Sequence, residues 1–99
     1  MKKHKTPVQA ACLGVMQNLS LTSDFHQRLL AQGVLEALDS SKDVDGGALS
    51  AQCAAVLYNF SLHEKSISQM MDLGGIFLVT HLSYSNVFKV SSRNHYGSP

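Results

Sequence analysis

Two residue types that could carry chemistry recur in this chain, the cysteines Cys12 and Cys53 and the asparagines Asn18 and Asn59. A cysteine acts as a nucleophile or metal ligand through its thiolate, which forms where a base or a cation lowers the thiol pKa. Each cysteine stands instead in an apolar stretch with helical periodicity and has no base in register, as is typical of a free cysteine buried as a small hydrophobe. We therefore expect no catalytic thiol.

The histidines nearest to these cysteines, His26 and His63, do not suggest a metal site. A structural zinc ion requires about four ligands, with short spacings such as Cys-x2-Cys or His-x3-His. Neither Cys12 with His26 nor Cys53 with His63 has such a spacing. We expect both histidines at exposed positions, and we predict no metal, no cofactor and no enzymatic activity.

The asparagines each open an Asn-apolar-Ser motif near the end of a helical stretch. A side-chain amide both donates and accepts hydrogen bonds, so Asn18 and Asn59 could bind the backbone of an extended peptide without reading its sequence. They could equally cap their own helices and bridge to the following turn. Both interpretations remain open. The adjacent Gln17 and Tyr58 would widen a peptide-binding surface.

The asparagines also belong to an internal repeat with an offset of about 41 residues. Residues 8–21 align without a gap with residues 49–62, and Gly33 aligns with Gly74 at the same offset. The identical pairs in the aligned stretch are Ala10/Ala51, Cys12/Cys53, Val15/Val56, Asn18/Asn59, Ser20/Ser61 and Leu21/Leu62. Periods of this length are typical of solenoid proteins.

Both copies of the repeat have the apolar periodicity of an α-helix, and period-two alternation is absent. The stripe of the first copy consists of Val8, Ala11, Cys12, Val15, Met16 and Leu19, and that of the second of Leu49, Cys53, Val56, Leu57 and Phe60. We expect an all-α protein in which these stripes are buried. Two short helices, broken by glycine, should follow each long helix.

A three-helix unit of this length resembles the armadillo repeat, in which the third helix ends in Asn-Leu-Ser and the next repeat opens with a helix finishing near Gly-Gly-Ile. The resemblance covers residues 8–83 and implies an α-solenoid, a right-handed superhelix with about two repeats. Residues 8–21 would be the third helix of one repeat, 24–62 a full repeat and 64–83 a partial one. Residues 1–7 are predicted to be a basic flexible N-terminus and 84–99 a disordered tail. We interpret the chain as a fragment or short form of a longer armadillo protein.

The resemblance implies a non-enzymatic interaction or scaffold module that displays a groove for a protein or an extended peptide segment. In armadillo proteins that bind peptides, an Asn near the end of each third helix contacts the peptide backbone, and Asn18 and Asn59 match that position. Family members that read basic signals carry a Trp four residues earlier, where this chain has Gly14 and Ala55, so basic signals are not the expected ligand. The alternative is an assembly element whose uncapped helix faces stack on a parent protein or on another copy.

Composition limits the kinds of partner. The chain has 99 residues, 44% of them hydrophobic and 15% charged, and a net charge of +1. Lys2, Lys3 and Lys5 hold three of the eight basic charges, which leaves no broad basic face for a nucleic acid. No apolar run is long enough to span a membrane. We expect a cytoplasmic protein, with the nucleus as the alternative.

Overall fold

The computed structural model describes the backbone of residues 2–84 and the side chains from residue 6 onward. Over this range the chain is all-α, as predicted, and contains no strand. The elements are α1 (Lys2–Ser20), η1 (Ser23–Phe25), α2 (His26–Ala31), α3 (Val34–Ser41), η2 (Val44–Gly47), α4 (Ser50–Phe60) and α5 (Glu64–Asp72). Residues 75–84 are also helical. The predicted disordered tail lies outside the described residues except for Tyr84, which belongs to this last helical segment.

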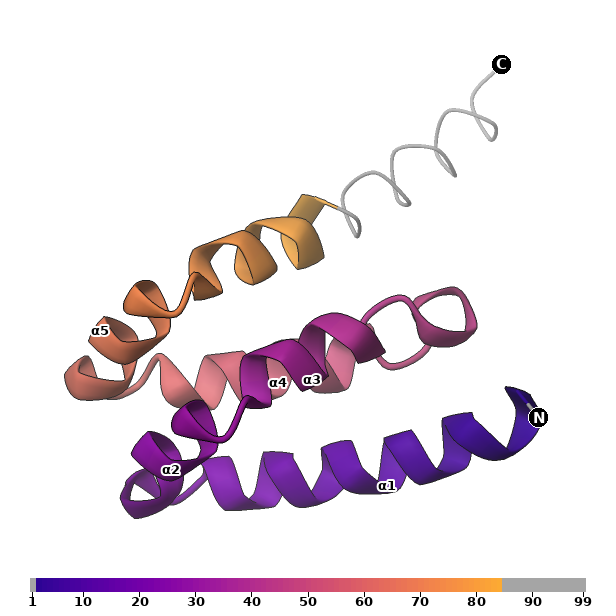
Figure 1. Ribbon diagram of the computed structural model, residues 1–99, viewed down its shortest axis with the longest axis horizontal. Helices are drawn as coiled ribbons and strands as arrows, with labels where there is room; N and C mark the ends of the chain where they lie inside the picture. Colours follow the sequence, from indigo (N-terminus) through magenta and orange to yellow (C-terminus); the bar gives the residue numbers. More distant parts are fainter. Residues whose placement is uncertain (1, 85–99) are drawn as a thin grey trace.

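The helices are arranged in three tiers (Figure 1). Helix α1 forms one outer tier, α3 and α4 lie in the middle, and α5 with the 75–84 segment forms the other outer tier. The glycines at the two repeat-related positions separate the short helices as predicted: Gly33 has φ 94° between α2 and α3, and Gly74 has φ 83° between α5 and the 75–84 segment. A positive φ is cheap only for glycine, which explains why both helices stop there.

The first helix begins earlier than expected. The predicted flexible N-terminus, residues 1–7, is helical from Lys2, and Pro7 lies inside the helix. A proline has no N–H to donate and therefore removes one backbone hydrogen bond from the helix. Helix α1 continues through this position near its beginning.

The core is centred on α4. Its predicted stripe is buried throughout, and Cys53, Val56 and Phe60 are completely inaccessible to solvent. The buried apolar residues from the other elements are Leu13, Leu30, Val34, Leu35, Leu38, Met70, Leu78 and Leu82. Because these come from α1, α2, α3, α5 and the 75–84 segment, every tier contributes to a single cluster around α4.

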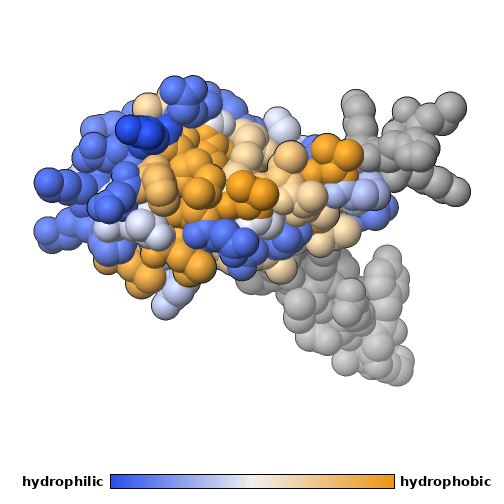
Figure 2. All heavy atoms as spheres, turned by 90° about the horizontal axis from the view of Figure 1, so that it is seen from below, coloured by the Kyte–Doolittle hydropathy of each residue, from blue (hydrophilic) through white to orange (hydrophobic). Residues whose placement is uncertain are grey.

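Most of the stripe predicted for α1 is exposed, although Met16 packs partly buried against the core, and this part of the prediction is wrong. Val15 is 57% exposed, whereas its repeat equivalent Val56 is 0% exposed. Val8 and Cys12 are exposed as well. Helix α1 packs through another side, which includes the buried Leu13 and Ser20. Viewed from the α1 side, apolar residues form a continuous patch on the surface (Figure 2).

We predict that Phe60→Ala destabilises the fold by about 3–5 kcal/mol, because it removes a fully buried ring and leaves a cavity at the centre of the core. Urea unfolding followed by far-UV circular dichroism measures the change. Tyr58→Ala is the matched control on the same helix, since this ring is 64% exposed and its loss should cost about 0.5 kcal/mol or less. Equal losses in the two variants would contradict the described packing of α4.

Candidate functional site

The two predicted asparagines lie in different environments. Asn59, in the last turn of α4, is buried, whereas Asn18, in the last turn of α1, is exposed. The Asn59 amide Nδ2 donates to the hydroxyl of Ser20 at 2.8 Å and lies 3.4 Å from the carbonyl oxygen of Gln17. Both acceptors belong to α1. Asn59 therefore joins two long helices at their C-terminal ends, a contact that neither of the two interpretations left open had described.

Ser20 completes this polar contact on the α1 side. Its hydroxyl donates to the Gln17 carbonyl at 2.7 Å and accepts from Asn59. The last carbonyls of a helix have no partner within the helix, so side-chain donors at this position satisfy groups that burial would otherwise leave unpaired. The interaction is specific because the donor on α4 must meet the last turn of α1.

His26 extends the polar contact to two further helices. The ring is almost completely buried, against our expectation of an exposed histidine, while His63 is exposed as expected. One ring nitrogen, Nε2, lies 2.6 Å from the backbone oxygen of Ser20, and Nδ1 lies 2.6 Å from the hydroxyl of Ser66 in α5. A carbonyl only accepts, so Nε2 carries the proton, and in the neutral ring Nδ1 accepts from Ser66.

The same ring also makes aromatic contacts. Its centroid lies 4.7 Å from that of Phe60 in α4, with an interplanar angle of 83°, and 5.2 Å from that of His63. His26 thus contacts the ends of α1, α4 and α5 from its place at the start of α2. We call Gln17, Ser20, His26, Asn59 and Ser66 the polar junction.

His26 and Ser66 were not predicted as members of a site. A signal for His26 was present, because the repeat aligns it with Ile67, an apolar residue, and thereby indicates an inward-facing position. Of the four predicted binding residues, the structure joins Gln17 and Asn59 through the carbonyl of Gln17. Asn18 and Tyr58 are exposed. Their contact with a peptide stays a prediction.

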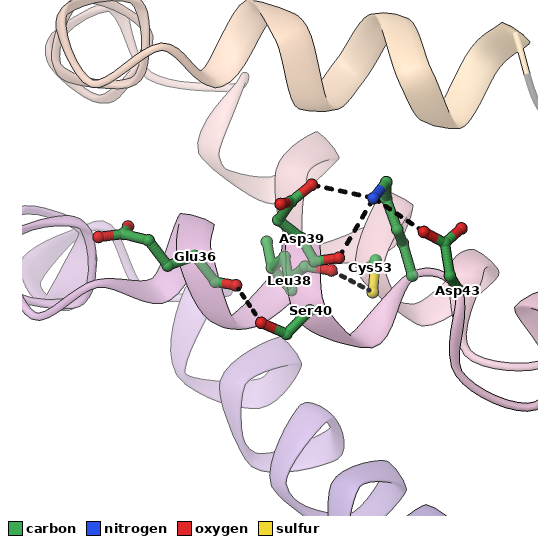
Figure 3. Close-up of polar contacts among 7 residues, drawn as sticks. Glu36, Leu38, Asp39, Ser40, Asp43 and Cys53 are labelled. Carbon is green, nitrogen blue, oxygen red and sulfur yellow. Dashed lines mark hydrogen bonds and ion pairs between the residues drawn. The ribbon is translucent and has the colours of Figure 1, made fainter.

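Electrostatic interactions are concentrated away from the polar junction, at the end of α3 (Figure 3). The Lys42 ammonium group lies 3.0 Å from a carboxylate oxygen of Asp39 and 3.1 Å from one of Asp43. Its hydrogen bonds to these carboxylates raise the pKa of Lys42. This cluster holds the chain as it leaves α3, and its charges are already paired.

The two cysteine thiols differ in their exposure to solvent. Burial raises the pKa of the Cys53 thiol, which donates to the backbone oxygen of Leu38 at 3.6 Å (Figure 3). A raised pKa disfavours the thiolate that nucleophilic attack and metal binding need. Cys12 is exposed. The two cysteines are therefore repeat equivalents with opposite accessibility.

In the part of the chain that the structure describes, no three residues of the types His, Cys, Asp and Glu are grouped so as to hold a metal ion. None of the helices described there is both long and apolar enough to cross a membrane. No family model, curated protein or solved structure matches this chain. The geometry of the polar junction is that of a connection between helices.

We predict that Asn59→Ala destabilises the fold by about 1–3 kcal/mol, because it removes a buried donor that two acceptors of α1 share. Asn18→Ala, at the exposed repeat equivalent, should change the free energy of unfolding by about 0.5 kcal/mol or less in dilute solution. Urea denaturation gives both values. A double-mutant cycle of Asn59→Ala with Ser20→Ala should yield a coupling of about 0.5 kcal/mol or more, and strict additivity would refute the contact.

Thiol labelling should separate the cysteines. In dilute native protein, Ellman's reagent should modify Cys12 rapidly and Cys53 only at the rate at which the fold opens, because burial protects Cys53 and raises its pKa. Cys12→Ser should remove the fast phase and Cys53→Ser the slow one. Two fast thiols in the native protein would show that α4 is not seated as described.

Proposed function

We propose that this chain is a non-enzymatic protein-interaction module, an armadillo-type α-solenoid of about two repeats that binds by stacking helix faces. The order of the helices and the contacts between them support this assignment. In each copy a long helix is followed by two short ones, and equivalent helices of the two copies are in contact, α1 with α4 and α2 with α5. Stacking of this kind builds the extended surfaces of solenoid proteins.

One observation carries the functional proposal: the apolar stripe of α1 is exposed, while the equivalent stripe of α4 is the centre of the core. A contiguous exposed apolar surface on a small protein marks a site of interaction with another protein. The stripe has the composition of a helix face that is covered by other helices, as α4 demonstrates in the same chain. We therefore favour stacking, the alternative in the sequence analysis, over peptide binding.

A peptide groove over Gln17, Asn18 and Tyr58 is the second candidate. The ring of Tyr58 is 64% exposed, and a rigid aromatic side chain of this kind often anchors a partner. The Asn59 amide donates to Gln17 and Ser20, so in this structure it makes hydrogen bonds within the chain. The exposed groups for a peptide are then those of Asn18 and Tyr58.

The two candidates can be separated by site-specific photo-crosslinking. The photoreactive amino acid benzoylphenylalanine replaces Val15 in the α1 stripe, Tyr58 in the proposed groove or, as a control, the exposed Lys65 in α5. We expect discrete protein adducts in cells from position 15. Adducts from position 58 alone would favour the groove, and the absence of discrete adducts from both positions would contradict the interaction function.

A further inference from the structure

Two exposed apolar faces lie in opposite outer tiers of the molecule (Figure 1). The first, which we call the α1 face, consists of Val8, Cys12, Val15 and Leu19. The second, which we call the α5 face, consists of Ile67, Met71, Ile76 and Val79, from α5 and the 75–84 segment. The middle tier, which contains α3 and α4, separates the two faces.

The residues of the α1 face are repeat equivalents of residues in α4 that form one side of an interface inside the chain. At the repeat offset its residues correspond to Leu49, Cys53, Val56 and Phe60 of α4. All four are buried. Two residues of this surface of α4 contact α2 and α3: Phe60 contacts the ring of His26, and the Cys53 thiol donates to the backbone of Leu38.

The α5 face corresponds to the other side of that same interface. At the repeat offset its residues match His26, Leu30, Leu35 and Leu38 of α2 and α3. These four are buried, whereas Ile76, the equivalent of Leu35, is 50% exposed. The chain thus contains one complete interface of this type and, at its two outer tiers, the two complementary halves of another.

We propose that copies of this chain assemble head to tail, with the α1 face of one copy seated on the α5 face of the next as α4 is seated on α2 and α3. This inference rests on the proposed function and names its partner, a second copy. The two halves cannot meet within one molecule because the middle tier lies between them. A contact of one surface with a different surface is heterologous, so each added copy presents a new free half.

The polar junction supplies a second, independent match. Asn59 donates to the hydroxyl of Ser20, which itself donates to the carbonyl of Gln17. The repeat equivalents of these acceptors are already arranged in the same way, since the Ser61 hydroxyl donates to the carbonyl of Tyr58 at 2.5 Å. In a head-to-tail contact, the exposed Asn18 of the incoming copy takes the place of Asn59 and donates to Ser61 and Tyr58. This fixes the register of the two copies.

The test uses the full chain and two variants that each block one half. Val15→Asp places a charge in the α1 face and Ile76→Asp places one in the α5 face; both positions are exposed, so the variants should keep the helical circular dichroism of the native protein. In sedimentation velocity, we expect the native chain to grow past the dimer as concentration rises. Each variant alone should stay monomeric, whereas their equimolar mixture should form dimers and stop there.

The mixture is the decisive measurement, because only a heterologous contact lets two blocked variants complement each other. Self-association of Ile76→Asp alone, a monomeric mixture or a native chain that is monomeric at every concentration would overturn the proposal. Lys65→Asp, at an exposed residue of α5 that belongs to neither face, is the control and should associate like the native chain. If Val15→Asp does not fold, Val8→Asp blocks the same face.

Two further results sharpen the outcome. Adding Asn18→Ala to Ile76→Asp should weaken the mixed dimer by about fivefold, because it removes one hydrogen-bonded contact. An unchanged dimer affinity would overturn the register. If the native chain is monomeric in solution yet crosslinks to another protein through position 15 in cells, this inference fails while the proposed function stands.

Discussion

The seating of α4 against α2 and α3 is the interaction on which the rest of the structure depends. Phe60 and Cys53 are completely buried there, and each contacts a different short helix, through the ring of His26 and the backbone of Leu38. Since α4 also packs on α1, and its neighbours in turn contact α5 and the 75–84 segment, one helix links all three tiers (Figure 1). A chain of this size buries a limited apolar surface, so a single shared core is what makes the short helices stable.

The polar junction fixes how the helices of the apolar core are aligned along one another. Apolar contacts depend mainly on area and shape and allow neighbouring helices to slide, whereas a buried donor must meet a particular acceptor. Asn59 ties α4 to the end of α1, and His26 ties the start of α2 to α1 and α5. The polar groups lie where four helix ends meet, so a shift of any one helix would leave a buried group without its partner.

Periodicity in the sequence was enough to predict an all-α chain, the breaks at Gly33 and Gly74 and the burial of the α4 stripe. The same reasoning failed for Val15, because periodicity shows which side of a helix is apolar and says nothing about which neighbour covers it. The contact that Asn59 makes with α1 was not predicted, for a different reason. A repeat alignment pairs Asn59 with Asn18, whereas Asn59 contacts Ser20 of the other repeat unit. Contacts between repeat units are not visible in such an alignment. Only the burial of His26 could have been inferred, from its alignment with Ile67.

The exposed stripe of α1 also bears on how this molecule comes apart. In proteins built from stacked units, the free energy of unfolding is approximately a sum of terms for each unit and for each contact between neighbours. The outer tiers, which contain α1 and α5, each leave apolar side chains such as Val15 and Met71 exposed, whereas α4 in the middle tier is buried along its apolar stripe. Unfolding should therefore begin in one of the outer tiers, and covering the exposed apolar side chains there should suppress that opening. Binding to a partner through these side chains would then slow the unfolding of the protein.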